Sequence, residues 1–348
     1  MKIVYISDAV YPYNKGGKEK RLFEISTRLA RRGHDVHIYT MNWWNGPKVI
    51  KENGVSLHAI SPLYPLYTKS GKRSIKEALA FSSYIFQGLI KEDFDILDVD
   101  HMPYFPIFPS WLVSRLKGKK AFVTWHEYWG SYWFKYLGWK GIFGYSIEFL
   151  SSFFGKRIAV SLLTKNRLLG RAQYIPNGIN TSFIKSIKPK GKFDVIFVGR
   201  LIKEKNVDLV IDSVKSEFKL GIIGTGPEEK KLKSLAKSFS NIFFLGNIKT
   251  QEDVYAYMKG AKVFAFPSER EGFGIGVLEA LACGTPALVL NEKDNASQYL
   301  VDKKFICTRE IFGEKLKKYA LRKGMLNTNI KKYNWENIIN SLEGVYNK

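Results

Sequence analysis

The sequence has few of the features that stabilise a small secreted protein or anchor a membrane protein. Its 348 residues include only two cysteines, Cys283 and Cys307, so a disulfide framework is excluded and a reducing compartment is favoured. No run of about 18 uncharged apolar residues occurs, which excludes a membrane-spanning helix. The apolar opening Ile3–Ile6 is too short for a signal peptide. These absences predict a cytoplasmic protein that is either soluble or peripheral on the inner face of the cell membrane.

Acidic residues are also scarce, because 55 lysines and arginines stand against 32 aspartates and glutamates, for a net charge of +23. Divided after Asn180, the excess is +13 in the first part and +10 in the second, so it is not a basic tail. The charge favours anionic partners, namely nucleic acid, acidic lipid head groups or phosphorylated small molecules, or serves solubility alone. No helix-turn-helix, zinc-ligand or ribonucleoprotein signature accompanies it, which disfavours nucleic acid.

The proportions of apolar and charged residues, 45% and 25%, are those of an ordinary globular protein and exclude a disordered chain. The length is sufficient for two domains. In the first half, short apolar runs alternate with amphipathic stretches, which predicts a parallel sheet with helices on both faces. The expected strands are Lys2–Ser7, Asp35–Thr40, Val55–Ile60, Ile96–Val99 and Ala121–Trp125, and the expected helices are Lys18–Arg32 and Ile75–Ile90.

The alternation restarts in the second half, which predicts a second doubly wound domain. Turn-rich Pro176–Asn180 and polar Lys185–Lys192 mark the boundary, so we expect domains at 1–180 and 181–330. Two such domains would leave a cleft at the carboxyl ends of their strands, where sheets of this kind bind ligands. The expected strands are Asp194–Val198, Leu220–Ile223, Ile242–Leu245, Val263–Phe266 and Ala287–Leu290, and the expected helices are Val207–Lys215, Glu228–Ser238, Glu252–Lys259, Ile275–Ala282 and Asn334–Asn347.

The first motif that can carry chemistry is Lys15-Gly16-Gly17-Lys18, in the loop between the first strand and its helix. Glycines at a helix start let backbone N–H groups approach an anion, which the helix dipole also favours. The segment is neither the dinucleotide pattern of three glycines nor a P-loop, which disfavours an oxidoreductase and a nucleoside triphosphatase. A turn that merely requires glycine is the alternative.

The second motif follows the strand predicted at Asp194–Val198. Gly199 and Arg200 end that strand, and Lys203 and Lys205 follow closely, which places cations at the carboxyl edge of the sheet. A diphosphate bound there would gain charge-assisted hydrogen bonds of about 1.5–3 kcal/mol each. A solvated basic loop is the alternative, and the segment alone does not decide between them.

The third and most specific motif is the segment Pro267–Glu279. Here the predicted strand Val263–Phe266 leads into a glycine-rich loop whose amides open a helix and can bind an oxyanion or a phosphate. Glu271 stands in the loop, and Glu279 lies about one turn into the helix. Carboxylates in these places suit paired sugar hydroxyls on either side of a phosphate, whereas the alternative is two unrelated surface acids.

Together these segments resemble the retaining glycosyltransferases of family 4, which have the GT-B fold of two Rossmann-like domains. Where that family often has a second glycine-rich turn, this chain has Asn291–Asn295. The likeness covers nearly the whole chain and rests on the Gly16-Gly17 loop, Ile175–Asn180, Val198–Lys205, Gly224–Pro227, Leu245–Asn247 and Glu271–Glu279.

The resemblance implies a nucleoside-diphosphate sugar bound mostly by the second domain. Arg200 and Lys205 would hold its diphosphate, Glu279 its ribose hydroxyls, and Glu271 the hydroxyls of the transferred sugar. The helix near 330–348 would cross back to the first domain. Further donor contacts are implied for Gly16, Gly17, Gly199, Phe273, Gly274 and Ile275.

The family's first-domain histidine matches His126, directly after the strand predicted at Ala121–Trp125. We expect His126 to contact the donor sugar or the leaving diphosphate, and so to act with the catalytic residues of the second domain. His101 is the weaker candidate. A histidine at a strand end that serves only structure is the alternative.

The segment Asp98-Val99-Asp100 resembles the metal-binding D-x-D of the other major glycosyltransferase fold. Because it falls in the first domain, away from the predicted diphosphate, we expect it to serve structure or the acceptor side. We therefore expect no metal ion and no cofactor, the nucleotide sugar being a substrate.

An aromatic segment, Trp125–Phe154, carries 13 aromatic residues in 30 and is followed by five cations without an acid as far as Asn180. Tryptophan, tyrosine and cations together are typical of a helix at the surface of an anionic membrane. An aromatic core or an acceptor groove is the alternative, and both stay open.

The sequence thus predicts a retaining, metal-independent glycosyltransferase, a hexosyltransferase that moves a sugar to an acceptor hydroxyl. The acceptor is expected to be a glycan or a lipid-linked glycan of the cell envelope, with an anionic membrane as a further partner. The rivals are a sugar-nucleotide epimerase or a phosphorylase on the same fold, and a basic module that binds lipid or nucleic acid.

Overall fold

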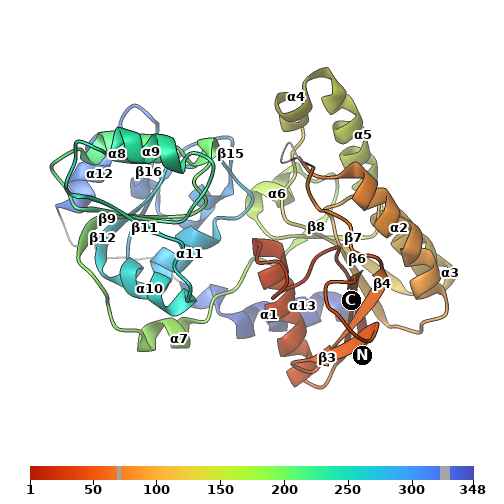
Figure 1. Cartoon of the computed structure of the whole chain (residues 1–348). Coiled ribbons are helices and arrows are strands. Elements are labelled where there is room, and N and C mark those ends of the chain that lie inside the picture. Colours follow the sequence, from red (N-terminus) through yellow and green to blue (C-terminus); the bar gives the residue numbers. More distant parts are fainter. Residues whose placement is uncertain (69–71, 322–329) are drawn as a thin grey trace. The chain divides into compact units, whose positions relative to one another are not determined.

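The computed structural model describes residues 1–68, 72–321 and 330–348. These residues form two compact units (Figure 1). The N-unit comprises Met1–Pro176 and Trp335–Lys348, and the C-unit comprises Asn177–Asn334. The link between them falls within the turn-rich segment at Pro176, and the chain returns to the N-unit with its α13 helix (Trp335–Asn347).

The N-unit is built on a sheet in the order β3-β4-β2-β1-β5-β6-β7-β8. β1 lies inside it, because Val4 pairs with His37 of β2 on one side and with Leu97 of β5 on the other. Connections leave β1 and β5 in opposite directions, so these strands flank the switch point at which such sheets bind ligands. The strands are β1 (Lys2–Ile6), β2 (Asp35–Met41), β3 (Val49–Glu52), β4 (Val55–Ser61), β5 (Ile96–Asp100), β6 (Lys120–Trp125), β7 (Lys156–Ala159) and β8 (Ala172–Tyr174).

One strand of this sheet differs from the parallel arrangement that the sequence predicts. β3 pairs antiparallel with β4, and residues Asn53 and Gly54 connect them with φ angles of 52° and 84°. Asn-Gly is the dipeptide that favours a two-residue turn with both φ angles positive. The remaining strands pair in parallel, as predicted.

The long helices of the N-unit form where apolar spacing and caps predict them. α2 begins after Ser74, whose Oγ accepts a hydrogen bond from the Glu77 amide at 3.2 Å. Between β5 and β8, in contrast, the sequence predicted only the strand β6, and the helices and the strand β7 found there were not predicted. The helices are α1 (Gly17–Arg31), α2 (Ile75–Ile90), α3 (Ile107–Leu116), α4 (Tyr132–Leu137), the 3₁₀ turn η1 (Gly138–Lys140), α5 (Gly141–Ser151) and α6 (Leu162–Arg167).

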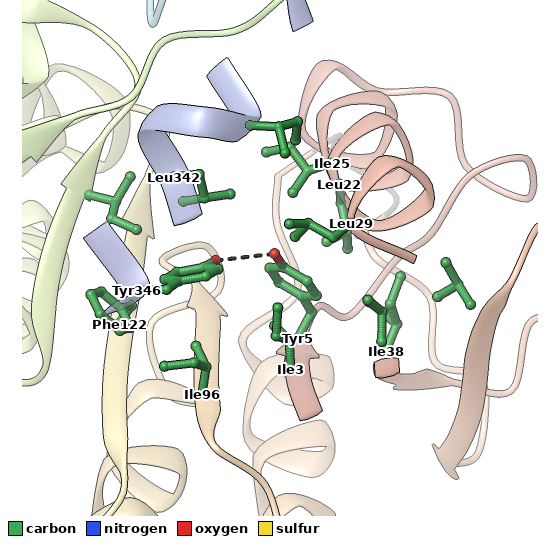
Figure 2. Close-up of a cluster of buried hydrophobic side chains, with 14 of the residues drawn as sticks. Ile3, Tyr5, Leu22, Ile25, Leu29, Ile38, Ile96, Phe122, Leu342 and Tyr346 are labelled. Atoms are coloured by element: carbon green, nitrogen blue, oxygen red, sulfur yellow. Dashed lines mark hydrogen bonds between the residues drawn. The ribbon is translucent and has the colours of Figure 1, made fainter. Parts of the chain in front are cut away.

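α13 completes the core on the α1 face of the N-unit. Its apolar residues, among them Ile339 and Leu342, pack with Leu22 and Leu29 of α1 (Figure 2). At its C-terminal end, Tyr346 is fully buried and its hydroxyl lies 3.1 Å from the Tyr5 hydroxyl of β1. The first half of the chain therefore relies on a helix that follows the entire C-unit.

The C-unit has a parallel sheet in the order β11-β10-β9-β12-β14-β16, as predicted for a second doubly wound domain. Its switch point lies between the neighbouring strands β9 and β12, where Ile196 pairs with Phe264. The strands are β9 (Phe193–Val198), β10 (Leu220–Ile223), β11 (Ile242–Gly246), β12 (Ala261–Phe266), β14 (Ala287–Leu290) and β16 (Ile306–Cys307), with β13 (Arg270–Glu271) and β15 (Asp294–Asn295) forming a separate pair.

Helices join the strands of the C-unit close to their predicted bounds, and α11 matches its prediction throughout. The α-helices are α7 (Thr181–Ser186), α8 (Val207–Val214), α9 (Glu229–Leu235), α10 (Gln251–Lys259), α11 (Ile275–Ala282) and α12 (Phe312–Ala320). Short 3₁₀ turns are η2 (Lys203–Lys205), η3 (Ala296–Leu300), η4 (Lys303–Phe305) and η5 (Ile330–Tyr333).

Candidate active site

Two loops that leave the neighbouring strands β9 and β12 bring Lys205 and Glu271 together. Lys205 Nζ donates to Glu271 Oε2 at 2.5 Å and to Ser268 Oγ at 3.3 Å. Both side chains keep part of their surface exposed, 15% for Lys205 and 22% for Glu271. The ammonium also lies over the Phe266 ring, 4.6 Å from its centre. A cation and a carboxylate therefore share one accessible corner at the carboxyl end of the sheet.

Buried amides hold this corner in place. Asn206 adopts a left-handed conformation, with φ at 47°, and its Nδ2 donates to the Pro267 carbonyl at 2.9 Å. Asn295 Nδ2 donates to the carbonyls of Ser268 and Leu290, both at 3.0 Å, while β15 pairs with β13, the strand that carries Glu271. The segment that replaces the family's second glycine-rich turn thus fastens the Glu271 strand.

The helix α11 opens directly after the glycine-rich loop, and Gly274 cannot be replaced without strain. Its φ is 95°, and a Cβ there would lie 2.5 Å from Ser297 Cβ. No side chain caps the start of α11, and its first turn holds no acidic residue. The backbone amides at Phe273, Gly274 and Ile275, which the resemblance implies as donor contacts, lie at this uncapped helix start.

Glu279, one turn into α11, is nearly buried and oriented by the neighbouring α10. Its Oε1 accepts from the Tyr255 hydroxyl at 3.0 Å and from Gln251 Nε2 at 3.2 Å. Tyr255 and Gln251 were not predicted as site residues; Tyr255 lies within the predicted helix Glu252–Lys259, and Gln251 directly precedes it. Their hydrogen bonds leave the Glu279 carboxylate in a fixed position as a hydrogen-bond acceptor.

Gly199 and Arg200 lie at the end of β9, where the backbone at Gly199 closely approaches the backbone at Gly224. A Cβ on Gly224 would lie 1.9 Å from the Gly199 carbonyl oxygen, and Leu201 donates its amide to Thr225 at 2.9 Å. Arg200 is exposed, and among the described residues its side chain has no hydrogen bond or ion pair, while its carbonyl accepts from the Ile202 amide at 3.0 Å. The structure therefore joins Lys205 to Glu271 but does not join Arg200 to either of them.

In the N-unit, the ends of β5 and β6 bring His126 and Asp100 together. His126 Nε2 lies 2.9 Å from Asp100 Oδ1, and the His126 amide donates to His101 Nδ1 at 3.2 Å. His101 is buried, and this burial lowers its pKa well below the usual value. Of the two candidate histidines, His126 alone keeps an appreciable exposed surface, and His101 supports its backbone.

The Gly16-Gly17 loop is less open to an anion than its sequence suggests. Lys18 directs its ammonium inward, to Asp8 at 2.5 Å and to Asp100 at 3.5 Å. The Glu19 carboxylate folds back over the helix start, where a Cβ on Gly16 would lie 2.2 Å from Glu19 Oε2. The Lys18 ammonium and the helix start at which an anion was expected thus face carboxylates of the chain itself.

The two aspartates of Asp98-Val99-Asp100 have different partners. Asp98 accepts from the Thr124 hydroxyl at 2.8 Å and from the Tyr346 hydroxyl at 2.6 Å, and burial raises its pKa to about 6. Asp100 faces His126 and Lys18. Within the part of the chain that the structure describes, no three His, Cys, Asp or Glu residues are grouped as a metal site. Their partners place both aspartates in the hydrogen-bond network of the N-unit.

The aromatic segment Trp125–Phe154 divides into an inner and an outer face. On the inner face, Trp125 is buried, and Glu148 accepts from the Trp129 and Gly130 amides at 2.8 and 2.7 Å. The outer residues of η1 and α5 face solvent, with exposed fractions of 74% for Trp139 and 70% for Phe143. α4 and α5 form a helical hairpin that stands out from the N-unit sheet (Figure 1). The inner residues therefore form an aromatic core, whereas the outer residues are exposed, and membrane docking of this outer face stays a prediction.

Other exposed apolar side chains of this hairpin are Phe134, Ile142, Tyr145, Phe149 and Leu150, with Phe153 just beyond it. Exposed lysines accompany them at Lys135, Lys140 and Lys156. No helix among residues 1–68, 72–321 and 330–348 is long and apolar enough to cross a membrane.

Comparisons with known proteins agree with this arrangement of two units. The family model described as Glycosyltransferase Family 4 matches residues 15–183, and the model described as Glycosyl transferases group 1 matches residues 179–332. An uncharacterized glycosyltransferase of Methanocaldococcus jannaschii is 28% identical over 259 residues, covering 67% of each chain.

A phosphatidyl-myo-inositol mannosyltransferase of Mycobacterium leprae is 27% identical over 300 residues, covering 80% of this chain and 76% of its own. Among solved structures, an Anabaena protein in complex with UDP-glucose superposes with a TM-score of 0.68 at 14% identity, covering all of both chains. This structural similarity, at 14% identity, shows that the two proteins share a fold. The two family models, the relatives and the paired parallel sheets identify the chain as a glycosyltransferase of family 4 with the GT-B fold of two Rossmann-like domains.

Proposed function

We propose that this glycosyltransferase moves a sugar from a nucleoside-diphosphate sugar to an acceptor hydroxyl, with retention of the anomeric configuration and without a metal ion. The observation that carries the proposal is the corner at the end of β9 and β12. There a partly exposed Lys205 and Glu271 meet, and the uncapped start of α11 follows in the same loop. A diphosphate needs a cation and amide donors, and a sugar needs a carboxylate beside them.

On this proposal, the charge that develops on the departing diphosphate is stabilised by Lys205, Arg200 and the amides that open α11. In the structure Lys205 is paired with Glu271. When the diphosphate binds, Lys205 turns to it, and Glu271 becomes available to the hydroxyls of the transferred sugar. Because donors placed in advance need no reorganisation during the reaction, they stabilise the transition state more than water would.

The bond changes follow what the family resemblance implies. The bond from the anomeric carbon to the phosphate oxygen breaks, and the acceptor hydroxyl attacks the same face of the sugar. The proton of that hydroxyl passes to the departing phosphate oxygen, so no metal ion and no covalent sugar–enzyme bond is required. Glu271 then positions the sugar and is not a nucleophile. A glycosyl adduct trapped on Glu271 would contradict this step.

Glu279 is the proposed ligand of the ribose hydroxyls. Tyr255 and Gln251 hold one of its oxygens, which fixes the direction of the carboxylate before the nucleotide binds. A carboxylate is an acceptor with several lone-pair directions, so it can accept from ribose hydroxyls while keeping these bonds.

For the acceptor, we propose a lipid-linked molecule presented at an anionic membrane, on which the α4–α5 hairpin docks. The support is the outer face of that hairpin, where exposed Trp139 and Phe143 stand among lysines. Aromatic side chains at the headgroup level and cations toward anionic lipid are what an interfacial helix uses. The mannosyltransferase relative is named for a phosphatidyl-myo-inositol acceptor.

Calorimetry and product analysis test the proposed reaction. The chain is titrated with uridine, guanosine and adenosine diphosphate sugars in the presence of EDTA, and saturable binding of one donor is expected. Product formed with a lipid-extract acceptor should keep the donor's anomeric configuration by proton NMR. Conversion of the donor without acceptor would instead indicate an epimerase, release of sugar phosphate on adding inorganic phosphate a phosphorylase, and no saturable binding a module that is not an enzyme.

A further inference from the structure

His126 is fixed at two points, which is more than a solvent-facing histidine requires. Its backbone amide donates to the buried His101, and its ring Nε2 lies 2.9 Å from Asp100 Oδ1. The side chain keeps 17% of its surface exposed. Among the residues that the structure describes, the other ring nitrogen, Nδ1, has no hydrogen-bond partner. The ring thus has one nitrogen bound to the protein and one available to a ligand.

Asp100 is itself held as an ionised acceptor. Its Oδ2 lies 3.5 Å from the Lys18 ammonium, which is fixed by Asp8 at 2.5 Å, by the Met102 carbonyl at 3.0 Å and by Ser7 Oγ at 3.2 Å. Burial alone would raise the pKa of the Asp100 carboxyl, but Lys18 and His126 outweigh it and lower the pKa. A carboxylate that stays ionised can only accept hydrogen bonds.

The ionised state of Asp100 depends on the groups around it, as a comparison with Asp98 shows. Asp98 lies two residues earlier on the same face of β5. Asp98 has hydroxyl groups of Thr124 and Tyr346 as partners, and burial raises its pKa to about 6. Asp100 is also nearly enclosed, yet it differs in having the Lys18 ammonium beside it. The ammonium keeps Asp100 in its acceptor form, next to the histidine.

We propose that Asp100 is a positioning residue that accepts the Nε2–H of His126, and so fixes the ring with Nδ1 presented to a hydroxyl of the transferred sugar. This inference rests on the proposed function, and on the expectation from the family resemblance that His126 contacts the donor sugar. Because Asp100 offers no proton, Nε2 must carry the one it shares. In the neutral ring Nδ1 is then the acceptor. Lys18 acts indirectly, by holding the Asp100 carboxylate in place.

The first test observes the tautomer and needs no substrate. Long-range proton–nitrogen spectra of the ¹⁵N-histidine-labelled chain contain five histidines, and the His126→Asn variant assigns the signal. We expect Nε2 of His126 to carry the proton in the wild type, and a mixture of tautomers in Asp100→Ala. A wild-type ring protonated only at Nδ1, or an Asp100→Ala spectrum unchanged at His126, would overturn the proposal.

The second test is a double-mutant cycle in kcat with the donor that the calorimetry identifies. Asp100→Ala should lower kcat about 10- to 100-fold, as is typical for a residue that orients another, with the donor KM changed less than about threefold. In the His126→Ala background, Asp100→Ala should lower kcat less than about twofold, because Asp100 acts through the imidazole that this background lacks. Equal losses in both backgrounds would mean a merely structural role and overturn the proposal.

Two variants keep the cycle interpretable. Asp100→Asn retains an amide oxygen that accepts from Nε2–H, so it should recover part of the lost kcat. If both Asp100 variants melt far below the wild type, their kcat values are not used. The tautomer of His126 in the Asp100→Asn variant then decides whether Asp100 positions the ring. The matched control is Asp35→Ala, which removes another aspartate–histidine pair of the N-unit, Asp35 with His37 at 3.0 Å. Its kcat should stay within about twofold of the wild type.

The outcomes separate this inference from the function on which it rests. If no nucleoside-diphosphate sugar is turned over, the proposed function fails, and the spectra still decide whether Asp100 fixes the ring. If transfer occurs but His126→Ala keeps the wild-type kcat, the transferase proposal stands and the positioning role of Asp100 is overturned.

Discussion

The two units hold their charged side chains in opposite ways. In the C-unit, neutral amides fasten the loops around Lys205 and Glu271, and Asn206 and Asn295 donate to backbone carbonyls there. In the N-unit, charged groups fasten one another, as Lys18 contacts both the fully buried Asp8 and the nearly enclosed Asp100. Lys205 and Glu271 also pair with each other, but both partners keep exposed surface and can turn to a ligand, whereas Lys18 is held by two carboxylates and supports the structure.

This comparison predicts, first, that cations of the C-unit matter for rate and little for stability. Lys205→Ala and Arg200→Ala should each lower kcat about 10²–10³-fold, the usual cost of one donor to a developing anion. The melting temperatures should stay near that of the wild type, because both side chains keep exposed surface. Steady-state kinetics and thermal unfolding measure the two effects. Lys190→Ala, which removes an exposed ion pair with Asp253, is the matched control and should leave kcat unchanged.

The second prediction concerns the pH dependence of N-unit stability. Burial raises the pKa of Asp98 to about 6, against 3.8 for an ordinary aspartate. Between these values the unfolded chain releases the proton and the folded chain keeps it. The free energy of unfolding should therefore fall as pH rises, by about 3 kcal/mol from this group. Urea unfolding at pH 4 and pH 7 measures the fall. An Asp98→Asn variant with the same pH dependence as the wild type would contradict the assignment.

The third prediction removes one hydroxyl from each unit. Tyr346→Phe leaves Asp98 Oδ2 without its 2.6 Å donor in a buried site, which should cost about 1–3 kcal/mol of unfolding free energy. Tyr319→Phe removes an exposed hydrogen bond to the Lys304 carbonyl in the C-unit and should cost less than about 0.5 kcal/mol. Chemical denaturation compares them. Equal losses of unfolding free energy in the two variants would mean that burial does not determine how much the Tyr346–Asp98 hydrogen bond contributes to stability.

The fourth prediction, with the smallest expected effect, compares exposed aromatic residues of the two units for their part in membrane binding. Trp139→Ser and Phe143→Ser should each weaken binding to vesicles with anionic lipid about tenfold, since each removes part of the area buried in the lipid. Phe243→Ser, at an exposed aromatic of the C-unit, should not change binding. Flotation at low salt is the measurement. A wild-type chain that does not float with anionic vesicles would remove the membrane proposal.

The residues of the candidate C-unit site could be selected from the sequence because they lie in short motifs after two strands. The strands at Leu220–Ile223 and Ala287–Leu290 and the helix at Ile275–Ala282 have their predicted bounds. The pair of Lys205 with Glu271 was not predicted as a contact, although both residues were. It follows from the parallel pairing of β9 with β12, which brings the two loops to one edge.

The N-unit shows where such reasoning fails. Lys18 belongs to a motif that suggests an anion site, but Asp8, earlier in the same connection between β1 and α1, and Asp100, at the end of β5, already pair with its ammonium. Tyr346 meets Asp98 from 248 residues away, and no local pattern encodes that contact. The antiparallel β3 did have a local signal, Asn53-Gly54, which a search for alternating strands and helices passes over.

The placement of α13 also bears on how the polypeptide is made. A ribosome synthesises the whole of the C-unit before Trp335–Asn347 emerges, so the core that contains Tyr5 lacks part of its packing until then. All residues of the C-unit, Asn177–Asn334, precede α13 in the sequence. The N-unit core, although it begins the sequence, therefore receives its last helix only after the whole C-unit has been synthesised.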